Sequence, residues 1–351
     1  MKNIRYSYYL QTIVVFLLCI SSFTSCIYDD VVEQEEHGLI IVKLGFDEIE
    51  TRAAGDILFP ATDAEITKVR IFVFVGEHLE VNRLFTAGQP SFNNPFVLDV
   101  VTGPKDIYVV ANESPALSLT LATVTTKSGL TGILADQISS PLTLPLPMLG
   151  SAFNVSVIEK TAPDRNSITI PLTRIAAKIS LRLNKANPAA NVKITKVTLL
   201  NNAGKSTLYP IPPATAVVGQ SYWNFSKSWI TPIDLTTTLS AVSDLGDIYV
   251  YENLDGSAAN KTNATQLELE ALYNNISTTY RVYINENVSS AVNPGDPGSS
   301  VTNPNDHLYK IKRGHQYNVD GTIVNLGEIT TLEVKVKILP WTVHQYKVPL
   351  Q

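Results

Sequence analysis

Residues 265–271 read TQLELEA, and this alternation decides the fold class. Leu267, Leu269 and Ala271 occupy every second position, and Glu268 and Glu270 lie between them. Because successive side chains of a β-strand point to opposite faces, the pattern predicts a strand with one buried and one solvated face. A sheet made of such strands must cover its apolar face with a second sheet. The stretch therefore predicts a β-sandwich.

Similar short runs, rich in Val, Ile, Thr and Tyr, recur between clusters of Gly, Pro and Asn, whereas helical periodicity is nearly absent. The chain is therefore predicted to be all-β. The expected strands cover residues 39–46, 68–75, 96–100, 107–111, 167–171, 177–183, 193–200, 247–251, 265–271, 279–284, 316–324 and 331–339. One helix or helical loop is expected over 128–139.

Three further features bear on the domain organisation. The run IFVFV at 71–75 is apolar on both faces, which predicts a central strand covered by the helical loop or by a neighbouring domain. The Pro-, Gly- and Ser-rich stretch at 285–305 predicts a long exposed loop. With 351 residues the chain is long enough for two cores, and residues 162–166 are the expected boundary between two sandwiches.

The N-terminus carries an export signal. Residues 7–26 read SYYLQTIVVFLLCISSFTSC, in which a short apolar run follows Lys2 and Arg5 and ends just before Cys26. This run is too short to span a bilayer, so it indicates a removable segment. We interpret it as a lipoprotein signal over 1–25, with Cys26 as the acylated first residue of the mature chain. The alternative is an ordinary secretory signal with an incidental cysteine.

Composition excludes several classes of protein. Without residues 1–25 the chain keeps Cys26 as its only cysteine, so it has no disulfide and must be held together by burial. The net charge is −5 and the basic residues form no stripe, which argues against nucleic acid as a partner. The five histidines have no metal-ligand spacing, and phosphate loops and nucleophile elbows are missing. We therefore expect no enzyme, no cofactor and no metal.

Residues 38–56, GLIIVKLGFDEIETRAAGD, combine a strand with a candidate cleavage site. Ile40, Val42, Leu44 and Phe46 share one face of the strand. Arg52 and Ala53 follow among small residues that a trypsin-like protease could enter. A cut after Arg52 would separate this strand from everything downstream. An N-terminal strand followed by an ordinary loop is the other interpretation, and residue types alone favour it.

The C-terminal residues 334–351 read VKVKILPWTVHQYKVPLQ. One strand ends near Pro340, and a second alternation then places Tyr346, Val348 and Leu350 on one face. This alternation has no obvious partner inside the chain. It is either a last edge strand or a strand offered to another subunit, and the sequence leaves these two options nearly even.

Six phrases of strand and turn residues follow one another along the chain. They are GPKDIYVVANES at 103–114, LPMLGS at 146–151, IPLTRIAAKISLRL at 170–183, VTLLNNAGKSTLYP at 197–210, IYVYENLDG at 248–256 and HLYKIKRGHQYNVDGTIVNLG at 307–327. In these phrases and in their order the chain resembles the FimA-type major fimbrillins of the type V pili of Bacteroidales.

The resemblance implies two tandem transthyretin-like β-sandwich domains, at 53–165 and 166–351, after a pro-segment at 26–52. It implies export as a lipoprotein to the outer membrane, carrying palmitate, and removal of the first strand by an Arg-specific protease. A strand from another fimbrial subunit would then fill the exposed groove, and residues 342–351 are the expected donor. The implied product is a cell-surface fimbria that supports adhesion.

Some points stay open at this stage. RGH at 313–315 departs from the family's turn, and the tail after Trp341 is short, which leaves stalk, tip and anchor positions open. Arg52 favours a processed subunit.

A different class of function is a surface lipoprotein that binds glycans, with Tyr222, Trp223, Trp229 and Trp341 stacking on sugar rings. We expect these aromatic residues to pack in the core instead.

Overall fold

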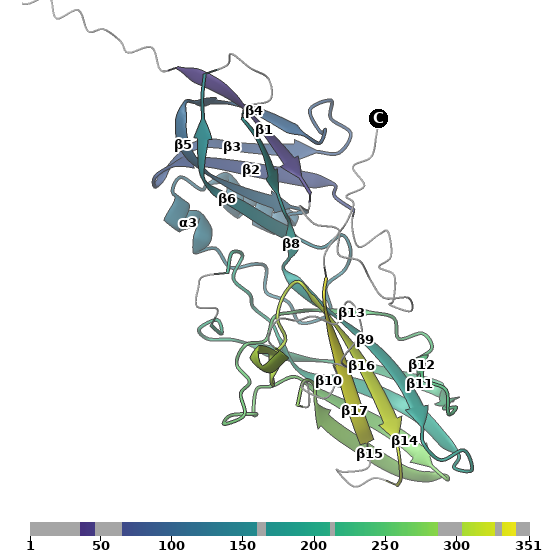
Figure 1. Ribbon diagram of the computed structural model, residues 1–351. Helices are drawn as coiled ribbons and strands as arrows, with labels where there is room; N and C mark the ends of the chain where they lie inside the picture. The colour runs from purple at the N-terminus through teal and green to yellow at the C-terminus, as the bar shows by residue number, and fades with distance from the viewer. Residues whose placement is uncertain are drawn as a thin grey trace, which may run out of the picture. The chain divides into compact units, whose positions relative to one another are not determined.

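The chain folds into β-sheets that face each other in pairs. The computed structural model describes residues 36–45, 65–159, 166–210, 215–286, 304–326 and 332–341. Within these ranges the strands form an N-terminal sandwich, drawn from purple to teal in Figure 1, and a C-terminal sandwich, drawn from teal to yellow. The predicted all-β fold of two sandwiches is confirmed.

The N-terminal sandwich consists of two sheets with strand orders β4-β1-β7 and β3-β2-β5-β6-β8. Its strands are β1 (His37–Leu44), β2 (Lys68–Val75), β3 (His78–Thr86), β4 (Phe96–Val101), β5 (Gly103–Ala111), β6 (Met148–Val157), β7 (Ser167–Ile170) and β8 (Thr173–Arg174). The alternate side chains of both sheets meet in one apolar core, as expected for strands with one buried face.

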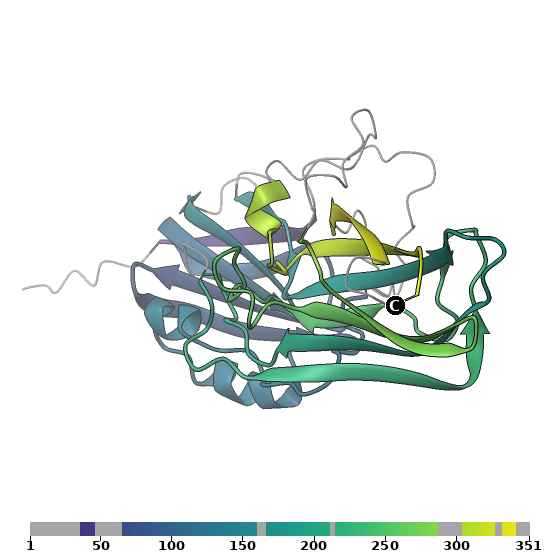
Figure 2. The ribbon, with the colours of Figure 1, turned by 90° about the horizontal axis from the view of Figure 1, so that it is seen from below.

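Strand β2 is buried on both faces, as its sequence predicted. Ile71 and Val73 point into the sandwich core, whereas Phe72 and Phe74 point to the other side of the sheet. There they pack against the helices α2 (Pro115–Ala122) and α3 (Lys127–Thr131), and against Leu208 and Tyr209 from the second half of the chain. Both of the covers considered from the sequence are therefore present. In Figure 2 the blue helices lie against one side of the N-terminal strands.

Both helices begin at a side chain that caps them. Ser114 precedes α2, and its hydroxyl accepts a hydrogen bond from the backbone N–H of Leu117 at 3.0 Å. Thr126 does the same for α3 with Gly129 N–H, also at 3.0 Å. These caps satisfy donors that have no partner inside a helix. The helix expected over 128–139 is thus shorter and starts one residue earlier, and α2 was missed.

The C-terminal sandwich has one sheet with the order β11-β10-β14-β15 and another with the order β12-β9-β16-β17, to which β13 adds by pairing with β9. Its strands are β9 (Ala176–Lys185), β10 (Val192–Ala203), β11 (Tyr222–Asp234), β12 (Ser240–Ala241), β13 (Ile248–Tyr251), β14 (Gln266–Tyr273), β15 (Ile276–Tyr283), β16 (His315–Ile323) and β17 (Leu332–Pro340). A 3-10 helix, η3, covers Pro304–His307.

The two sandwiches follow each other with little connecting chain. Strands β7 and β8 lie beyond residue 165, yet β7 pairs with β1 and β8 pairs with β6. This pairing argues for placing the end of the N-terminal domain near Ile175 and not at 165, and the domain limits remain a proposal. The described residues from His37 onward belong to one compact unit.

The strand predictions agree with the structure where the apolar pattern was strong. The run 68–75 is β2 with the predicted bounds, and TQLELEA forms most of β14, in which every second residue from Leu267 to Tyr273 is buried. The first strand begins two residues earlier than expected and ends at Leu44.

Three long strands were missed because their patterns are weak. In β3, at an edge of its sheet, Phe85 is the one buried residue. Strand β6 contains Gly150, where a Cβ would lie 2.5 Å from the carbonyl oxygen of Pro171. Strand β11 is an edge strand whose pairing with β10 shifts register twice. Small residues and bulges conceal the period of two on which strand prediction depends.

Some predictions concern residues outside the described ranges. They are the signal over 1–25, most of the loop at 285–305 and the tail after Trp341. Among the described residues, no helix is both long and apolar enough to cross a membrane.

Candidate functional site

Strand β1 is the part of the predicted site that the structure describes. Its sequence HGLIIVKL alternates between buried and more exposed positions. Ile40 and Val42 are completely buried and Leu44 is 4% exposed, so all three predicted apolar residues in the described range point into the core. Phe46, the fourth predicted residue, lies outside the described ranges.

This strand lies in the middle of its sheet, between β4 and β7. It pairs antiparallel with β4, where Ile40 is opposite Leu98 and Val42 is opposite Phe96. It pairs parallel with β7, where Val42 is opposite Ile168. We call the space that β1 occupies between these two neighbours the β1 slot. Without β1, the facing edges of β4 and β7 would both carry unpaired backbone groups.

Burial of β1 contributes a large share of the stability of this sandwich. Full burial of an aliphatic side chain is worth about 1.5–3 kcal/mol, so the three buried residues contribute on the order of 5–9 kcal/mol before the ladder is counted. The whole stability of a domain is about 5–15 kcal/mol. An empty β1 slot is therefore too costly to persist in water.

Two asparagine residues hold the strand, Asn94 at its C-terminal end and Asn166 at its middle. The side-chain amide of Asn94 accepts from the Leu44 N–H at 3.0 Å and donates to the Leu44 carbonyl at 3.1 Å, which replaces a ladder pair just before β4 begins. The backbone carbonyl of Asn166 accepts from Ile41 N–H at 2.9 Å. The Asn166 side chain also exchanges two hydrogen bonds with the backbone of Ile158.

Gly38 marks a point where the slot has no room for a side chain. A Cβ on residue 38 would lie 2.5 Å from the carbonyl oxygen of Ile158 and 2.8 Å from Cγ1 of Val157. Since Asn166 holds the backbone at Ile158, this wall cannot easily move. The sequence pattern of β1 did not reveal this constraint, because it arises from a segment 120 residues away.

The other predicted site residues are not in the described ranges. These are Cys26, Arg52, Ala53, Tyr346, Val348 and Leu350. Their roles stay predictions.

The described chain ends at Trp341, which anchors the start of the C-terminal tail. Trp341 is 2% exposed, and its indole stacks on Tyr249 with ring centroids 5.6 Å apart. The guanidinium of Arg174 lies 4.2 Å from the indole centroid and donates to the Trp341 carbonyl at 2.9 Å. Such a cation–π contact is strongest when it is desolvated, as here. The tail therefore leaves from a fixed point beside β8.

The four aromatic residues considered for glycan binding do not form an open platform. Trp223 and Trp341 are buried, at 8% and 2% exposure. The indole N–H of Trp229 donates to the Ser243 carbonyl at 3.2 Å, and the ring packs on the core. Tyr222 is half-buried and its hydroxyl donates to Asp255. Core packing, the interpretation preferred from the sequence, holds for Trp223 and Trp341.

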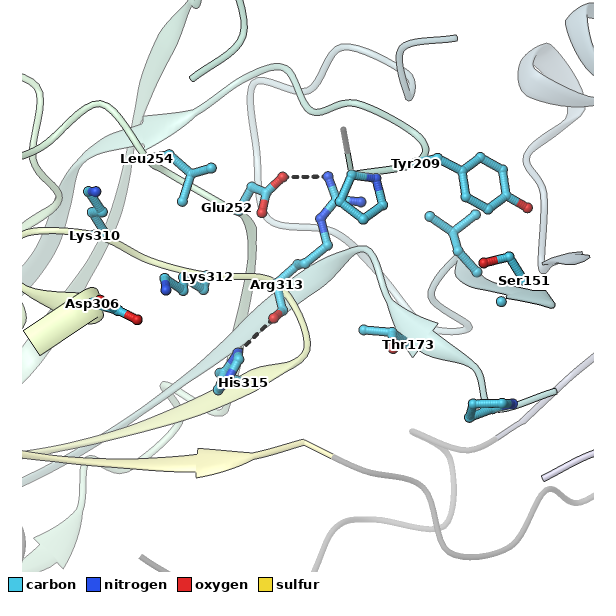
Figure 3. Close-up of a pocket in the computed structure, with 14 residues that line it drawn as sticks. Ser151, Thr173, Tyr209, Glu252, Leu254, Asp306, Lys310, Lys312, Arg313 and His315 are labelled. Atoms are coloured by element: carbon cyan, nitrogen blue, oxygen red, sulfur yellow. Dashed lines mark hydrogen bonds and ion pairs between the residues drawn. The ribbon is translucent and has the colours of Figure 1, made fainter. Parts of the chain in front are cut away.

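A second feature is a cavity of about 850 Å³ between residues of β6, the segment before β9 and the turn at 306–315. We call it the junction cavity, and Figure 3 shows the residues that line it. Its cationic residues Lys310, Lys312 and Arg313 come from one short stretch of sequence, IKRGH and the lysine before it. In the sequence, RGH at 313–315 is visible only as a departure from a family pattern.

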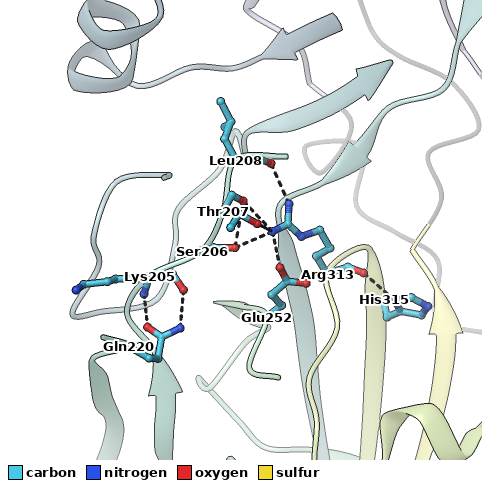
Figure 4. Close-up of polar contacts among 8 residues, drawn as sticks. All are labelled: Lys205, Ser206, Thr207, Leu208, Gln220, Glu252, Arg313 and His315. Atoms are coloured by element: carbon cyan, nitrogen blue, oxygen red, sulfur yellow. Dashed lines mark hydrogen bonds and ion pairs between the residues drawn. The ribbon is translucent and has the colours of Figure 1, made fainter. Parts of the chain in front are cut away.

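Arg313 holds the wall of this cavity together. Its guanidinium donates to the carbonyls of Leu208 and Thr207 at 2.9 and 2.8 Å, and to the Ser206 hydroxyl at 2.9 Å. It also forms an ion pair with Glu252 (Figure 4). These contacts join the start of β16 to the segment that carries Tyr209, whose hydroxyl donates to the Val109 carbonyl at 2.9 Å.

Two neutral histidines lie beside the cavity. His307 is 1% exposed, and its Nδ1 is 2.9 Å from the hydroxyl of Tyr317, which also accepts from Lys312 N–H. The rings of His307 and His315 meet edge to face, 4.8 Å apart. Burial lowers the pKa of His307 to about 3, and it also lowers the pKa of His315. Among the described residues, no three His, Cys, Asp or Glu side chains converge as metal ligands.

Two sequence comparisons relate the chain to known proteins. Residues 43–199 match the model of a family described as "Major fimbrial subunit protein (FimA)". The chain is 35% identical over 344 residues to the major fimbrium subunit FimC of Porphyromonas gingivalis, which covers 95% of this chain and 70% of FimC.

Solved structures share the fold at low sequence identity. A fimbrilin, FimA, of P. gingivalis aligns with a TM-score of 0.57 at 19% identity, over 90% of this chain and 100% of that one. The tip fimbrial protein Mfa3 of P. gingivalis, solved with a C-terminal truncation, aligns with a TM-score of 0.54 at 16% identity, over 87% of this chain and 99% of that one.

The burial of β1 generates a stability prediction. Val42→Asp should lower the free energy of unfolding by about 3 kcal/mol or more, because it places an unpaired charge in the core. Lys43→Asp, on the exposed face of the same strand, should change it by only about 0.5 kcal/mol. Urea unfolding of the chain without residues 1–25 measures both. Equal losses in the two variants would contradict the assignment of faces.

The buried histidine generates a pH prediction. Unfolded His307 takes up a proton near pH 6.5, whereas the folded form does so only near pH 3, so stability should fall as the pH drops through this window. His307→Gln should weaken that dependence, because it removes the proton uptake of the unfolded state. His78→Gln, at an exposed position of β3, should leave it unchanged. Urea midpoints at pH 7 and 4.5 test this, and parallel curves for all three proteins would refute it.

Proposed function

This chain belongs to the family of FimA-type major fimbrial subunit proteins, and from that premise we propose that it polymerises by exchanging β1 for a strand of another subunit. Its structural role as a fimbrial subunit agrees with the FimC match and with the fimbrilin fold. This role is not enzymatic, and it places the protein in a fimbria at the cell surface.

The position of β1 is the single observation that carries the proposal. A strand at the edge of a sheet could be removed with the loss of one ladder, but β1 is paired on both edges and buried along one face. Its removal would leave a groove with pockets for Ile40, Val42 and Leu44 and with backbone partners on both sides. Such a groove is suited to an incoming strand, for which ladder bonds provide affinity and alternate pockets provide specificity.

Cleavage after Arg52 is the proposed trigger. Arg52 follows Gly45, the last described residue after β1, by seven positions. A cut there would leave β1 held by non-covalent contacts alone, and it would separate Cys26 with its acyl chains from Ala53 onward. We propose an Arg-specific protease as the processing partner, and an outer-membrane lipoprotein as the precursor.

The proposed donor is the C-terminal tail with Tyr346, Val348 and Leu350. Three alternating apolar side chains match the three pockets of the β1 slot in number and spacing. The root of the tail at Trp341 is held by Arg174 and Tyr249, so a donating subunit presents its tail from a defined place. Each subunit would accept one strand and donate one. This head-to-tail contact does not close on itself, so it produces a filament that supports adhesion.

Arg52→Ala should give folded subunits that stay monomeric, because β1 cannot leave its slot. We expect size-exclusion chromatography after protease treatment to show polymers for the unmodified chain and monomers for the variant. Replacing residues 50–55 of the variant by the recognition sequence of an unrelated protease should restore assembly when that protease is added. Polymers of uncleaved Arg52→Ala protein would show that assembly does not need the cut.

The donor is tested by changes in the tail. Val348→Asp combined with Leu350→Asp should give subunits that are processed but do not polymerise, because two charges would enter apolar pockets without partners. Lys347→Asp, on the opposite face of the same alternation, is the matched control and should assemble. The slot stays intact in the double variant, so it should still cap growing ends of the unmodified protein. Normal polymerisation of the double variant would move the donor to another segment.

A further inference from the structure

We propose that the junction cavity binds a small organic anion, an acid with a carboxylate, sulfate or phosphate group, through Lys310 and Lys312. This site is separate from the β1 slot, and the proposal does not depend on strand exchange. Figure 3 shows both lysines on one side of the cavity and Ser151 and Thr173 on the other.

The charged side chains that line the junction cavity favour a bound anion. In the part of the chain that the structure describes, neither Lys310 nor Lys312 forms a side-chain ion pair or hydrogen bond, although both are half-buried. Of the two carboxylates that line the cavity, Glu252 is already bound to Arg313, and Asp306 is exposed at the cavity margin. With Glu252 bound to Arg313, two half-buried lysines face one remaining carboxylate, Asp306, so the lining keeps a positive excess that favours an anion.

Among the described residues, Arg313 keeps one buried donor without a partner. Arg313 is 9% exposed and uses its two terminal nitrogens for Leu208, Ser206, Thr207 and Glu252. Its Nε–H is buried and has no hydrogen-bond partner. An unsatisfied buried N–H costs about 1–3 kcal/mol. The guanidinium thus keeps one unused donor in a residue that lines the cavity.

The size and the lining of the cavity indicate the kind of ligand. A cavity of about 850 Å³ lies within the range of sites for small organic molecules and is much larger than a bare ion needs. Leu149, Pro171 and Leu254 offer apolar surface, and the hydroxyls of Ser151 and Thr173 offer polar contacts. Tyr209 is 5% exposed, so it presents no ring face on which a neutral sugar could stack. We therefore expect the cavity to bind its ligand through charge and not through ring stacking.

Binding is measured by isothermal titration calorimetry on the chain without residues 1–25, at low salt. The probes are a disaccharide with a glucuronate unit, a sulfated disaccharide, inorganic phosphate, inorganic sulfate and neutral lactose. We expect at least one acidic disaccharide to bind, about tenfold or more tighter than lactose and the inorganic ions. The two acidic sugars distinguish a carboxylate ligand from a sulfate ligand, and binding by inorganic phosphate alone would overturn the assignment to an organic acid.

Lys310→Gln combined with Lys312→Gln should weaken binding at least about tenfold, which is about 1.4 kcal/mol. Lys43→Gln combined with Lys335→Gln makes the same change in charge at exposed positions of β1 and β17, and it should bind as the unmodified chain does. Urea midpoints confirm that both double variants are folded. Equal affinity of the two double variants, or no binding of either acidic sugar, would overturn the proposal.

Discussion

The N-terminal sandwich depends on one strand that is hydrogen-bonded on both of its edges. β1 provides ladder partners to β4 and β7 and three buried side chains to the core at the same time. The two contributions cannot be lost separately, because removing the strand exposes backbone groups and apolar surface together. Asn94 and Gly38 then limit where an occupant of the slot can lie, one by binding the backbone of position 44 and the other by excluding a side chain at position 38. A sandwich built in this way needs an occupant in its slot.

A second group of contacts joins the two sandwiches, and buried cations dominate it. Arg174 comes from the last strand of the N-terminal sandwich. It makes a hydrogen bond and a cation–π contact with Trp341, at the end of the C-terminal sandwich. Arg313 ties the start of β16 to the segment with Tyr209, which packs on the outer face of the sheet that contains β2. Arg313 makes several directed hydrogen bonds, and Arg174 combines a hydrogen bond with a cation–π contact, which a lysine at the same place could not reproduce. The beginning of the tail and the wall of the junction cavity are therefore fixed by the same part of the fold.

Strong apolar patterns predicted most strands, including the edge strands β4, β15 and β17, and weak patterns concealed three. β2 and β14 lie inside their sheets, and their sequences show the burial pattern plainly. β3 and β11 are edge strands, and β6 carries glycine and small residues where the segment around Pro171 comes close. An edge strand buries fewer residues, and a close backbone approach requires small ones, so in both cases packing conceals the period of two.

The sequence by itself determined the all-β class, the burial of Ile40, Val42 and Leu44, and the need to cover both faces of β2. These properties follow from the order of polar and apolar residues within a single strand, which is local information. Only the tertiary structure decided that β1 lies between β4 and β7, that Asn94 closes the end of its slot, and that Arg313 is buried against Leu208. Leu44 and Asn94 are 50 positions apart, and Arg313 and Leu208 are 105 apart. Contacts over such separations depend on how strands pair and sheets stack, and periodicity within one strand carries no record of its distant partners.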